Sequence, residues 1–324
     1  MSESPFPISS ELRDDESGLG FCLRSVAMNG GRLSALHRLL GIGASERLKS
    51  VHAPRLAQWF GVDKARLAHR LPATLPRSMG ARRACYGHLF RQPGVLRTNQ
   101  PQVCPQCVFE KGYLLDAWDL TLSTCCLEHG LSLTGICPQC QAVIKWDRKG
   151  VQWGGCRHHL GCTDNAVLAT PELLYAQRIL QASLRSEPCS GLAEDTGVPR
   201  WLTGLSLDGW MQVFYAFGLL PSSWSPLCPR ELSRCLAPAA AQEVVRRALG
   251  RLQAFTARAE DEGAWASLVA RAPLVSLMTC PTGCQDEAVG RQLFQRVFGQ
   301  KEMDLLVRGY PELGQLDLFE GAAT

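Results

Sequence analysis

Residues 104–140 read CPQCVFEKGYLLDAWDLTLSTCCLEHGLSLTGICPQC and decide how the middle of the chain folds. The stretch begins and ends with the same tetrapeptide, C-P-Q-C, and carries C-x-x-H at Cys126 and His129. Zinc in structural sites is bound tetrahedrally by four Cys or His side chains, which short turns of this kind present in pairs. The stretch therefore predicts metal-binding turns rather than ordinary loops.

Cysteine is concentrated in this part of the chain. Eight of the 15 cysteines and three of the seven histidines lie between residues 104 and 162. We expect a cytoplasmic protein, because the chain starts without a basic and apolar secretory signal. Thiols stay reduced there, and clustered cysteines bind metal more often than they form disulfides. Unligated cysteines packed as small apolar side chains are the alternative, which two C-P-Q-C turns disfavour.

Pairing the turns in sequence order gives two sites, and hence two Zn²⁺ ions. The first site comprises Cys104, Cys107, Cys126 and His129, with 18 residues between its turns. The second comprises Cys137, Cys140, Cys156 and one further ligand, with 15 residues between the turns. Both spacings are typical of zinc sites. Cys125 is the spare cysteine, because only Cys126 forms C-x-x-H with His129.

The fourth ligand of the second site lies within CRHHLGC, residues 156–162. Thiolates favour structural zinc, so we expect Cys162 to be this ligand. His158 and His159 are also within reach of Cys156 and stay alternatives.

The motifs do not predict an enzyme. A catalytic zinc keeps an open position beside a general base, whereas the first site has four ligands. A nucleobase deaminase would carry H-x-E ahead of its cysteines, and the chain has neither this tripeptide there nor a P-loop, a G-x-S-x-G or a dinucleotide fingerprint. The acids near the turns, Glu110, Asp116, Asp119 and Glu128, are expected to be ordinary surface residues. A zinc hydrolase with an open second site is the remaining enzymatic hypothesis.

A basic segment precedes the cysteines. No Asp or Glu occurs from Lys64 to Phe109, although the net charge of the whole chain is only +4. The cations of this segment are Lys64, Arg66, Arg70, Arg77, Arg82, Arg83, Arg91 and Arg97. This asymmetry favours a surface that binds nucleic acid or an acidic partner. A solvated, arginine-rich face is the alternative.

Within this part of the chain, residues 52–72 predict two short helices. Pro54 suits a first helical turn, Gly61 ends the first helix, and Asp63 can cap the second. The pair matches a helix-turn-helix whose second helix enters a major groove. Two packed helices in any small bundle give the same pattern.

We expect a mainly α fold with small zinc-ribbon-like β elements. Its parts are a disordered lead-in at 1–18, an N-terminal helical, basic helix-turn-helix-like unit at 19–99, a double zinc-binding region at 100–168, a helical C-terminal domain at 169–310 and a tail at 311–324. Apolar residues recur at helical spacing beyond residue 168. No run of about 18 or more apolar residues occurs, so we expect no membrane span.

The combination of C-P-x-C, W-D-L, C-x-x-H-G and a second C-P-x-C resembles the TniQ/TnsD family of transposition target-selection proteins. The stretch SGLGFCLRSVAMNG at 17–30 is similar to the N-terminal part of that family, and the resemblance spans residues 15–165. Seven of the expected ligands, from Cys104 to Cys156, match the metal positions of the family. The stretch CRHHLGC departs from its pattern.

The resemblance implies an adaptor without catalytic activity. Such proteins recognise a target, either DNA itself or a CRISPR ribonucleoprotein effector, and recruit an AAA+ ATPase that engages the transposase. Some members form head-to-tail dimers, so a homodimer is one assembly that the resemblance implies. The alternative is a stand-alone, sequence-specific DNA-binding transcription regulator that uses the helix at 63–70.

Overall fold

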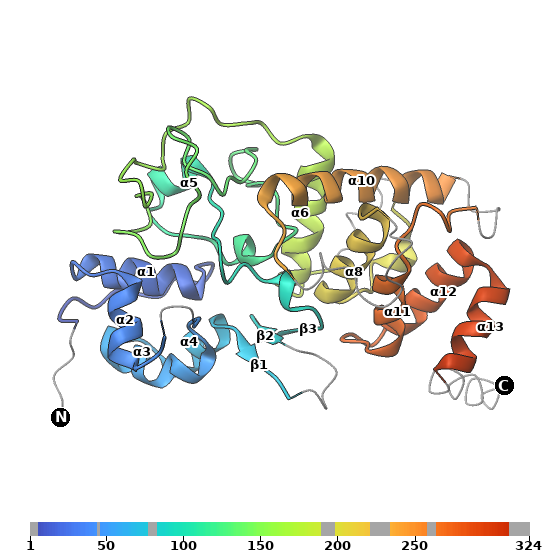
Figure 1. Ribbon diagram of the computed structural model, residues 1–324, viewed down its shortest axis with the longest axis horizontal. Helices are drawn as coiled ribbons and strands as arrows, with labels where there is room; N and C mark the ends of the chain where they lie inside the picture. The colour runs from blue at the N-terminus through green and yellow to red at the C-terminus, as the bar shows by residue number, and fades with distance from the viewer. Residues whose placement is uncertain are drawn as a thin grey trace. The chain divides into compact units, whose positions relative to one another are not determined.

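The computed structural model describes residues 6–43, 46–76, 83–188, 198–220, 234–257 and 264–310. Contacts divide the chain into two compact units (Figure 1). The first is Met1–Gln177 with Arg234–Gln242, and the second is Arg178–Ser233 with Glu243–Thr324. The helical part expected at 19–99 and the cysteine-rich part expected at 100–168 therefore belong to one unit. The chain is mainly helical, as predicted, and has a small three-stranded sheet.

The first unit begins with short helices. They are α1 (Gly18–Met28), α2 (Leu33–Leu40), the 3₁₀ turn η1 (Ser50–His52), α3 (Ala53–Phe60) and α4 (Lys64–Arg70). The hydroxyl of Ser17 caps α1 by accepting the Gly20 N–H. In Figure 1, α3 and α4 lie below α1, and both α3 and α1 contact α4.

The predicted pair of helices is confirmed at α3 and α4. Gly61 ends α3 at φ +69°, a left-handed conformation that glycine adopts without strain. The Asp63 carboxylate caps α4 by accepting the Arg66 N–H at 2.7 Å. Phe60 and Leu67 are buried, so the two helices pack through their apolar sides.

The sheet directly follows α4 in sequence. Its antiparallel strands are β1 (Ala73–Thr74), β2 (Arg83–Cys85) and β3 (His88–Phe90), with Ala84 opposite both Ala73 and Leu89. We expected β structure in the cysteine-rich region instead. That region contains isolated bridges, such as Val103 with Thr134, and no strand between residues 100 and 168.

The lead-in expected to be disordered at 1–18 is ordered in its described part, residues 6–18. Phe6 and Leu12 are buried in the core of the first unit, and the Phe6 ring lies 5.2 Å from that of Phe60. Glu16 is fully buried and accepts from Arg24 at 2.7 Å. The expectation failed because a few separated apolar anchors do not make a periodic pattern. Residues 1–5 and the expected tail at 311–324 lie outside the described residues.

Asp119 connects the parts of the first unit. It ends the 3₁₀ turn η4 (Asp116–Asp119) and is buried, not at the surface as expected. Its carboxylate accepts hydrogen bonds from Ser17 Oγ at 2.7 Å and from Tyr86 Oη. Its carbonyl accepts the Arg97 N–H at 2.7 Å. One side chain thus joins the start of α1, the β2–β3 turn and the cysteine-rich stretch.

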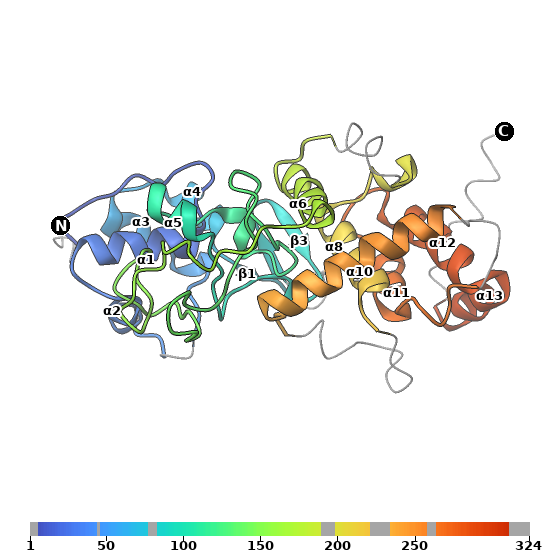
Figure 2. The same ribbon diagram turned by 90° about the horizontal axis from the view of Figure 1, so that it is seen from above.

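The second unit is helical. Helix α6 (Pro171–Leu184) spans the division between the units, and it is followed by η5 (Arg200–Leu202), α8 (Leu207–Gly218), α10 (Pro238–Ala257), α11 (Arg271–Thr279), α12 (Asp286–Phe298) and α13 (Gln300–Gly309). Helix α8 is buried along its whole length and contacts α11. Figure 2 shows α10 beside α8, where Arg247 and Arg251 donate to carbonyls at the end of α8. In the described part of the chain, no helix is long and apolar enough to cross a bilayer.

Stability should fall as the pH rises because of Asp119. Burial raises the pKa of this carboxyl from 3.8 to about 7, so folding takes up a proton between these values. The shift corresponds to roughly 4 kcal/mol of stability that is present at low pH and lost as the pH approaches 7. Asp119→Asn keeps an oxygen that can accept from Ser17 and Tyr86 but cannot ionise.

We expect urea unfolding of Asp119→Asn to depend less on pH between 5 and 8 than that of the wild type, and the variant to be the more stable protein at pH 8. Subtracting the free energy of unfolding of one protein from that of the other removes the contribution of every other titrating group. Parallel stability curves would show that Asp119 does not titrate in this range.

Candidate metal centres

The first turn of the cysteine-rich region is the start of a helix. Cys104 is the N-cap of α5 (Pro105–Glu110), and Cys107 lies in its first turn. Pro105 suits the first helical position because it has no N–H to leave unpaired. The Val108 N–H donates to the Cys104 carbonyl at 3.0 Å, which closes the turn and directs both thiols to one side.

The second turn runs from Cys126 to Gly130. The Gly130 N–H donates to the Cys126 carbonyl at 2.9 Å, and Gly130 has φ +63°. The Cys126 N–H donates to the Leu131 carbonyl at 2.7 Å, so the chain reverses sharply here. The reversal brings His129 beside Cys126 and both beside the turn of Cys104.

Four side chains meet as predicted at the first cluster, Cys104, Cys107, Cys126 and His129. His129 Nδ1 lies 3.7, 3.1 and 3.5 Å from the Sγ atoms of Cys104, Cys107 and Cys126, in that order. Tetrahedral zinc with its usual bond lengths separates neighbouring ligand atoms by about 3.5–3.8 Å. Hydrogen bonds from the Cys104 and Cys107 thiols lower the pKa of Cys126, which favours a thiolate at this position. The donor set fits a metal ion.

A second cluster combines Cys137, Cys140, Cys156 and His158, whose ligand atoms all lie within 4.8 Å of one another. The distance from Cys137 Sγ to His158 Nδ1 is 3.6 Å. The Cys137 N–H donates to the Ala142 carbonyl at 2.8 Å, closing the turn that holds Cys137 and Cys140. Two clusters of three cysteines and one histidine can therefore hold two metal ions.

His158, not Cys162, completes the second cluster. Cys162 Sγ instead donates to the Asp164 carboxylate at 3.3 Å. Arg157 adopts φ +70°, and the Gly154 N–H donates to the His158 carbonyl at 2.9 Å, which turns His158 back toward Cys156. An arginine in the left-handed region is uncommon, so the sequence gives no sign of this turn.

His159, the other alternative, is not a ligand either. Its Nδ1 accepts the Gly161 N–H at 3.1 Å. Its ring makes edge contacts with Trp153 and Phe109 at centroid distances of 5.3 and 6.4 Å.

The two clusters differ in exposure. Cys104, Cys107 and Cys126 are buried, whereas Cys140 is exposed and Cys156 and His158 are half-buried. Each cluster offers four protein ligands, which leaves no open position for a nucleophilic water. The arrangement favours a structural role at both clusters over a hydrolytic centre at the second.

Glu110 is a functional candidate that the sequence did not single out. We expected an ordinary surface acid, yet its Oε2 lies 2.9 Å from His129 Nε2. The available signal was its position one helical turn after Cys107 on α5.

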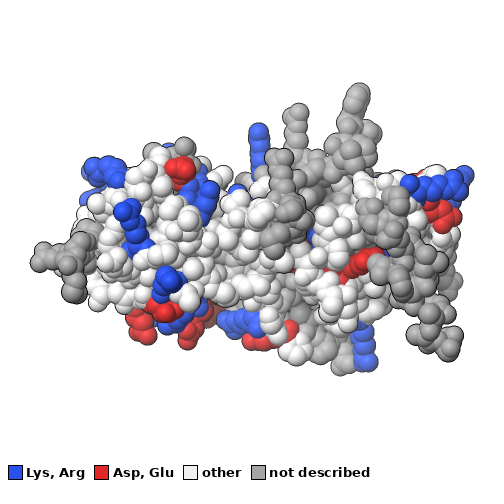
Figure 3. Space-filling view, turned by 90° about the horizontal axis from the view of Figure 1, so that it is seen from below, with Lys and Arg blue, Asp and Glu red and all other residues white. Residues whose placement is uncertain are grey.

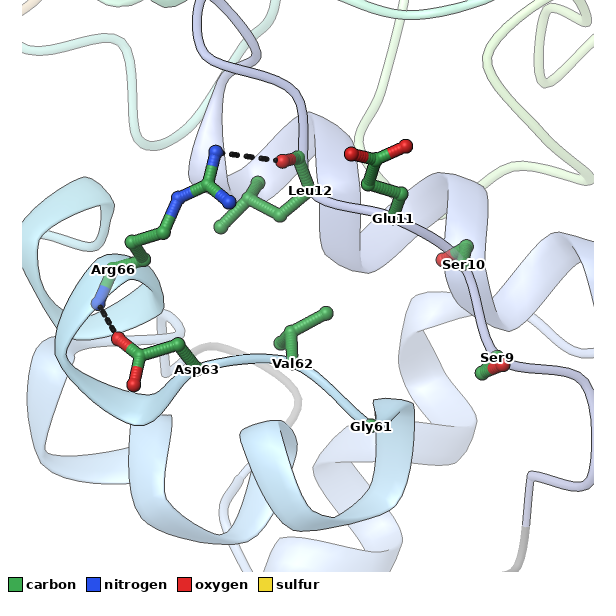
Figure 4. A pocket seen from close by; sticks show the side chains of 8 residues that line it. All are labelled: Ser9, Ser10, Glu11, Leu12, Gly61, Val62, Asp63 and Arg66. Carbon is green, nitrogen blue, oxygen red and sulfur yellow. Dashed lines mark hydrogen bonds between the residues drawn. The ribbon is translucent and has the colours of Figure 1, made fainter.

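The basic residues of α4 are partly engaged within the first unit. Arg66 donates to the Leu12 carbonyl at 3.0 Å and to the Asp14 carboxylate, beside a cavity of about 360 Å³ between residues 9–12 and the α3–α4 turn (Figure 4). Arg70 donates to the backbone carbonyls of Glu16 and Asp14. Lys64 is exposed at the start of the helix.

Other cations of the expected basic surface lie elsewhere. Arg91 and Arg97 are buried, and Arg97 donates to the carbonyls of Thr121 and Leu236 at 2.9 Å each. Both are corrections to the expected surface, and for Arg97 the reason is that buried backbone carbonyls can satisfy a guanidinium without any carboxylate. Arg83 is half-buried on β2, and Arg77 and Arg82 lie outside the described residues.

Figure 3 shows how charge is distributed on one face of the molecule. Among the described residues visible there, Lys and Arg side chains lie singly or beside Asp and Glu, with uncharged surface between them. This face has no continuous basic patch in its described part.

His158→Ala should lower the metal content by one ion per chain, whereas Cys162→Ser should leave it unchanged. A tetrahedral site that loses one of four ligands binds its ion far more weakly, and Cys162 is not in the cluster. Elemental analysis after dialysis against a mild chelator measures the number of metal ions per chain. Loss of metal in Cys162→Ser with retention in His158→Ala would reverse the assignment.

Adjacent glycines offer a second test of this cluster. A Cβ at Gly154 would lie 2.8 Å from Cys156 Sγ, too close for any real contact, whereas one at exposed Gly155 would meet nothing within 4 Å. Gly154→Ala should therefore displace a ligand and reduce the second cluster's metal content, and Gly155→Ala should not. Equal metal content in the two variants would contradict this geometry.

Comparison with known proteins relates some of these features to a family. No curated protein matches the chain. The family model TniQ matches residues 7–133. The matched part contains α1–α4, the sheet and the whole first cluster through His129, and it ends before Cys137. Residues 7–133 of the chain are thus similar to the TniQ family.

Proposed function

We propose that this chain is a zinc-stabilised adaptor for target-site selection in DNA transposition. The observation that carries the proposal is the TniQ match over residues 7–133, because membership of this family implies a role in transposition target selection. The adaptor has no catalytic activity of its own. It links a target-recognition element to an AAA+ regulator, and through that regulator to the transposase.

Each cluster would hold one Zn²⁺ ion. The distances within the first cluster support this, and its cysteines are part of the same buried core as Leu114 and Trp118. Structural zinc contributes on the order of 10 kcal/mol to small domains of this kind. The ion would connect α5 to the turn at Cys126 in a stretch with little regular secondary structure.

The target element is DNA or a CRISPR ribonucleoprotein effector. Either one would contact this chain, as a monomer or a homodimer, through groups at its surface. Of the cations expected to bind it, Lys64 is exposed and Arg66 is half-exposed, whereas Arg91 and Arg97 are buried. The small number of exposed cations among the described residues of this segment supports a docking adaptor over a protein that binds DNA tightly by itself, since non-specific affinity for DNA comes from neutralised phosphates.

A stand-alone DNA-binding regulator is the second candidate. The tight Gly61 turn between α3 and α4, followed directly by an antiparallel sheet, favours it. In this hypothesis α4 is the recognition helix of a helix-turn-helix.

DNA binding measured with and without the AAA+ ATPase separates the candidates. We expect the chain alone to bind duplex DNA weakly, with a log–log salt slope no steeper than about −2, because few phosphates can be neutralised. With the ATPase and target present, a ternary complex should form. Tight, sequence-specific binding by the chain alone, without any ATPase recruitment, would establish the regulator instead.

Lys64→Glu should weaken this assembly while leaving the fold intact, since Lys64 is exposed at the start of α4. Lys301→Glu, an exposed charge reversal outside the TniQ match, is the matched control. Equal complex formation by both variants in fluorescence anisotropy would exclude α4 from the binding surface.

A further inference from the structure

His129 has a partner at each of its ring nitrogens. Nδ1 faces the three cysteine sulfurs of the first cluster, at 3.1 to 3.7 Å. Nε2 lies 2.9 Å from Glu110 Oε2. A metal-binding imidazole nitrogen carries no proton, so the ring proton belongs on Nε2, where the Glu110 carboxylate accepts it.

Glu110 is itself held in place. Gln106 Nε2 donates to Glu110 Oε1, and both residues lie on α5 four positions apart. The same short helix carries the ligand Cys107. Helix α5 thus supplies both the ligand Cys107 and the carboxylate that orients the ligand His129.

The second cluster has no equivalent arrangement. In the described ranges, His158 Nδ1 lies 3.6 Å from Cys137 Sγ, but no carboxylate bonds to the His158 ring. Cys140 is also exposed there, whereas the cysteines of the first cluster are buried.

We propose that Glu110 is a positioning residue that fixes the tautomer and orientation of His129 and makes the first cluster the tighter of the two metal sites. The inference rests on the proposed function, in which both clusters hold zinc. Carboxylates that bond to ligating histidines typically change metal affinity about 10- to 100-fold when removed. Glu110 therefore sets which ion the chain retains when zinc is scarce.

Glu128 is a matched control near the same histidine. Its carboxylate lies near His129 but pairs with Lys111 Nζ, and it makes no hydrogen bond to the ring. Replacing Glu128 removes a nearby negative charge without removing the orienting contact. Any effect of charge alone should appear in both variants.

The test is zinc competition with a chromophoric chelator on the full chain. The wild type should release two ions in two steps, and His158→Ala should identify the weaker step by removing it. Glu110→Ala should weaken only the tighter step, by about 10- to 100-fold, and Glu110→Gln should lie between it and the wild type. Glu128→Ala should stay within about twofold of the wild type, a change too small for a lost orienting contact.

Two further readouts separate positioning from general destabilisation. At saturating zinc the far-UV circular dichroism of Glu110→Ala should match the wild type, and the ¹⁵N shift of His129 Nε2 should lose the signature of its hydrogen bond. The role of Glu110 would be overturned if Glu110→Ala lost zinc affinity equally in both steps or lost none. It would also be overturned if Glu128→Ala lost as much affinity as Glu110→Ala. A wild type that binds no zinc would overturn the proposed function as well, so the two failures are distinguishable.

Discussion

The first unit depends on one constraint, the convergence of four side chains on a single point. These side chains are Cys104, Cys107, Cys126 and His129. The two turns that supply these ligands are 18 residues apart, and the chain between them has little regular structure beyond α5 and η4. A metal ion with four ligands would fix both turns at once, and the core around Trp118 then packs against them.

Asp119 extends that order to the rest of the unit. Its carboxylate binds Ser17 at the start of α1 and Tyr86 in the β2–β3 turn, so segments distant in sequence meet at one buried acid. The arginines act in the same way. Arg70 and Arg97 donate to backbone carbonyls inside the unit rather than facing solvent. These two arginines of the basic segment therefore stabilise the fold and do not add to a basic surface.

The sequence alone was sufficient to predict the structure where residues close together in the chain determine it. Ligand spacing identified the whole first cluster, and Gly61 with Asp63 identified the α3–α4 turn. The sequence was insufficient where the structure depends on backbone conformation or on contacts with residues far along the chain. His158 replaces Cys162 because Arg157 adopts a left-handed conformation, and the burial of Arg97 depends on carbonyls as far along the chain as Leu236. No pattern of residue types around these positions carries that information.

Native mass spectrometry of the purified full chain tests the central claim, that zinc ions organise the cysteine-rich region. The account predicts two Zn²⁺ per chain with all cluster cysteines reduced, and loss of near-UV circular dichroism when a strong chelator removes the ions. A chain that stays folded without metal, or that carries disulfides between the cluster cysteines, would contradict it.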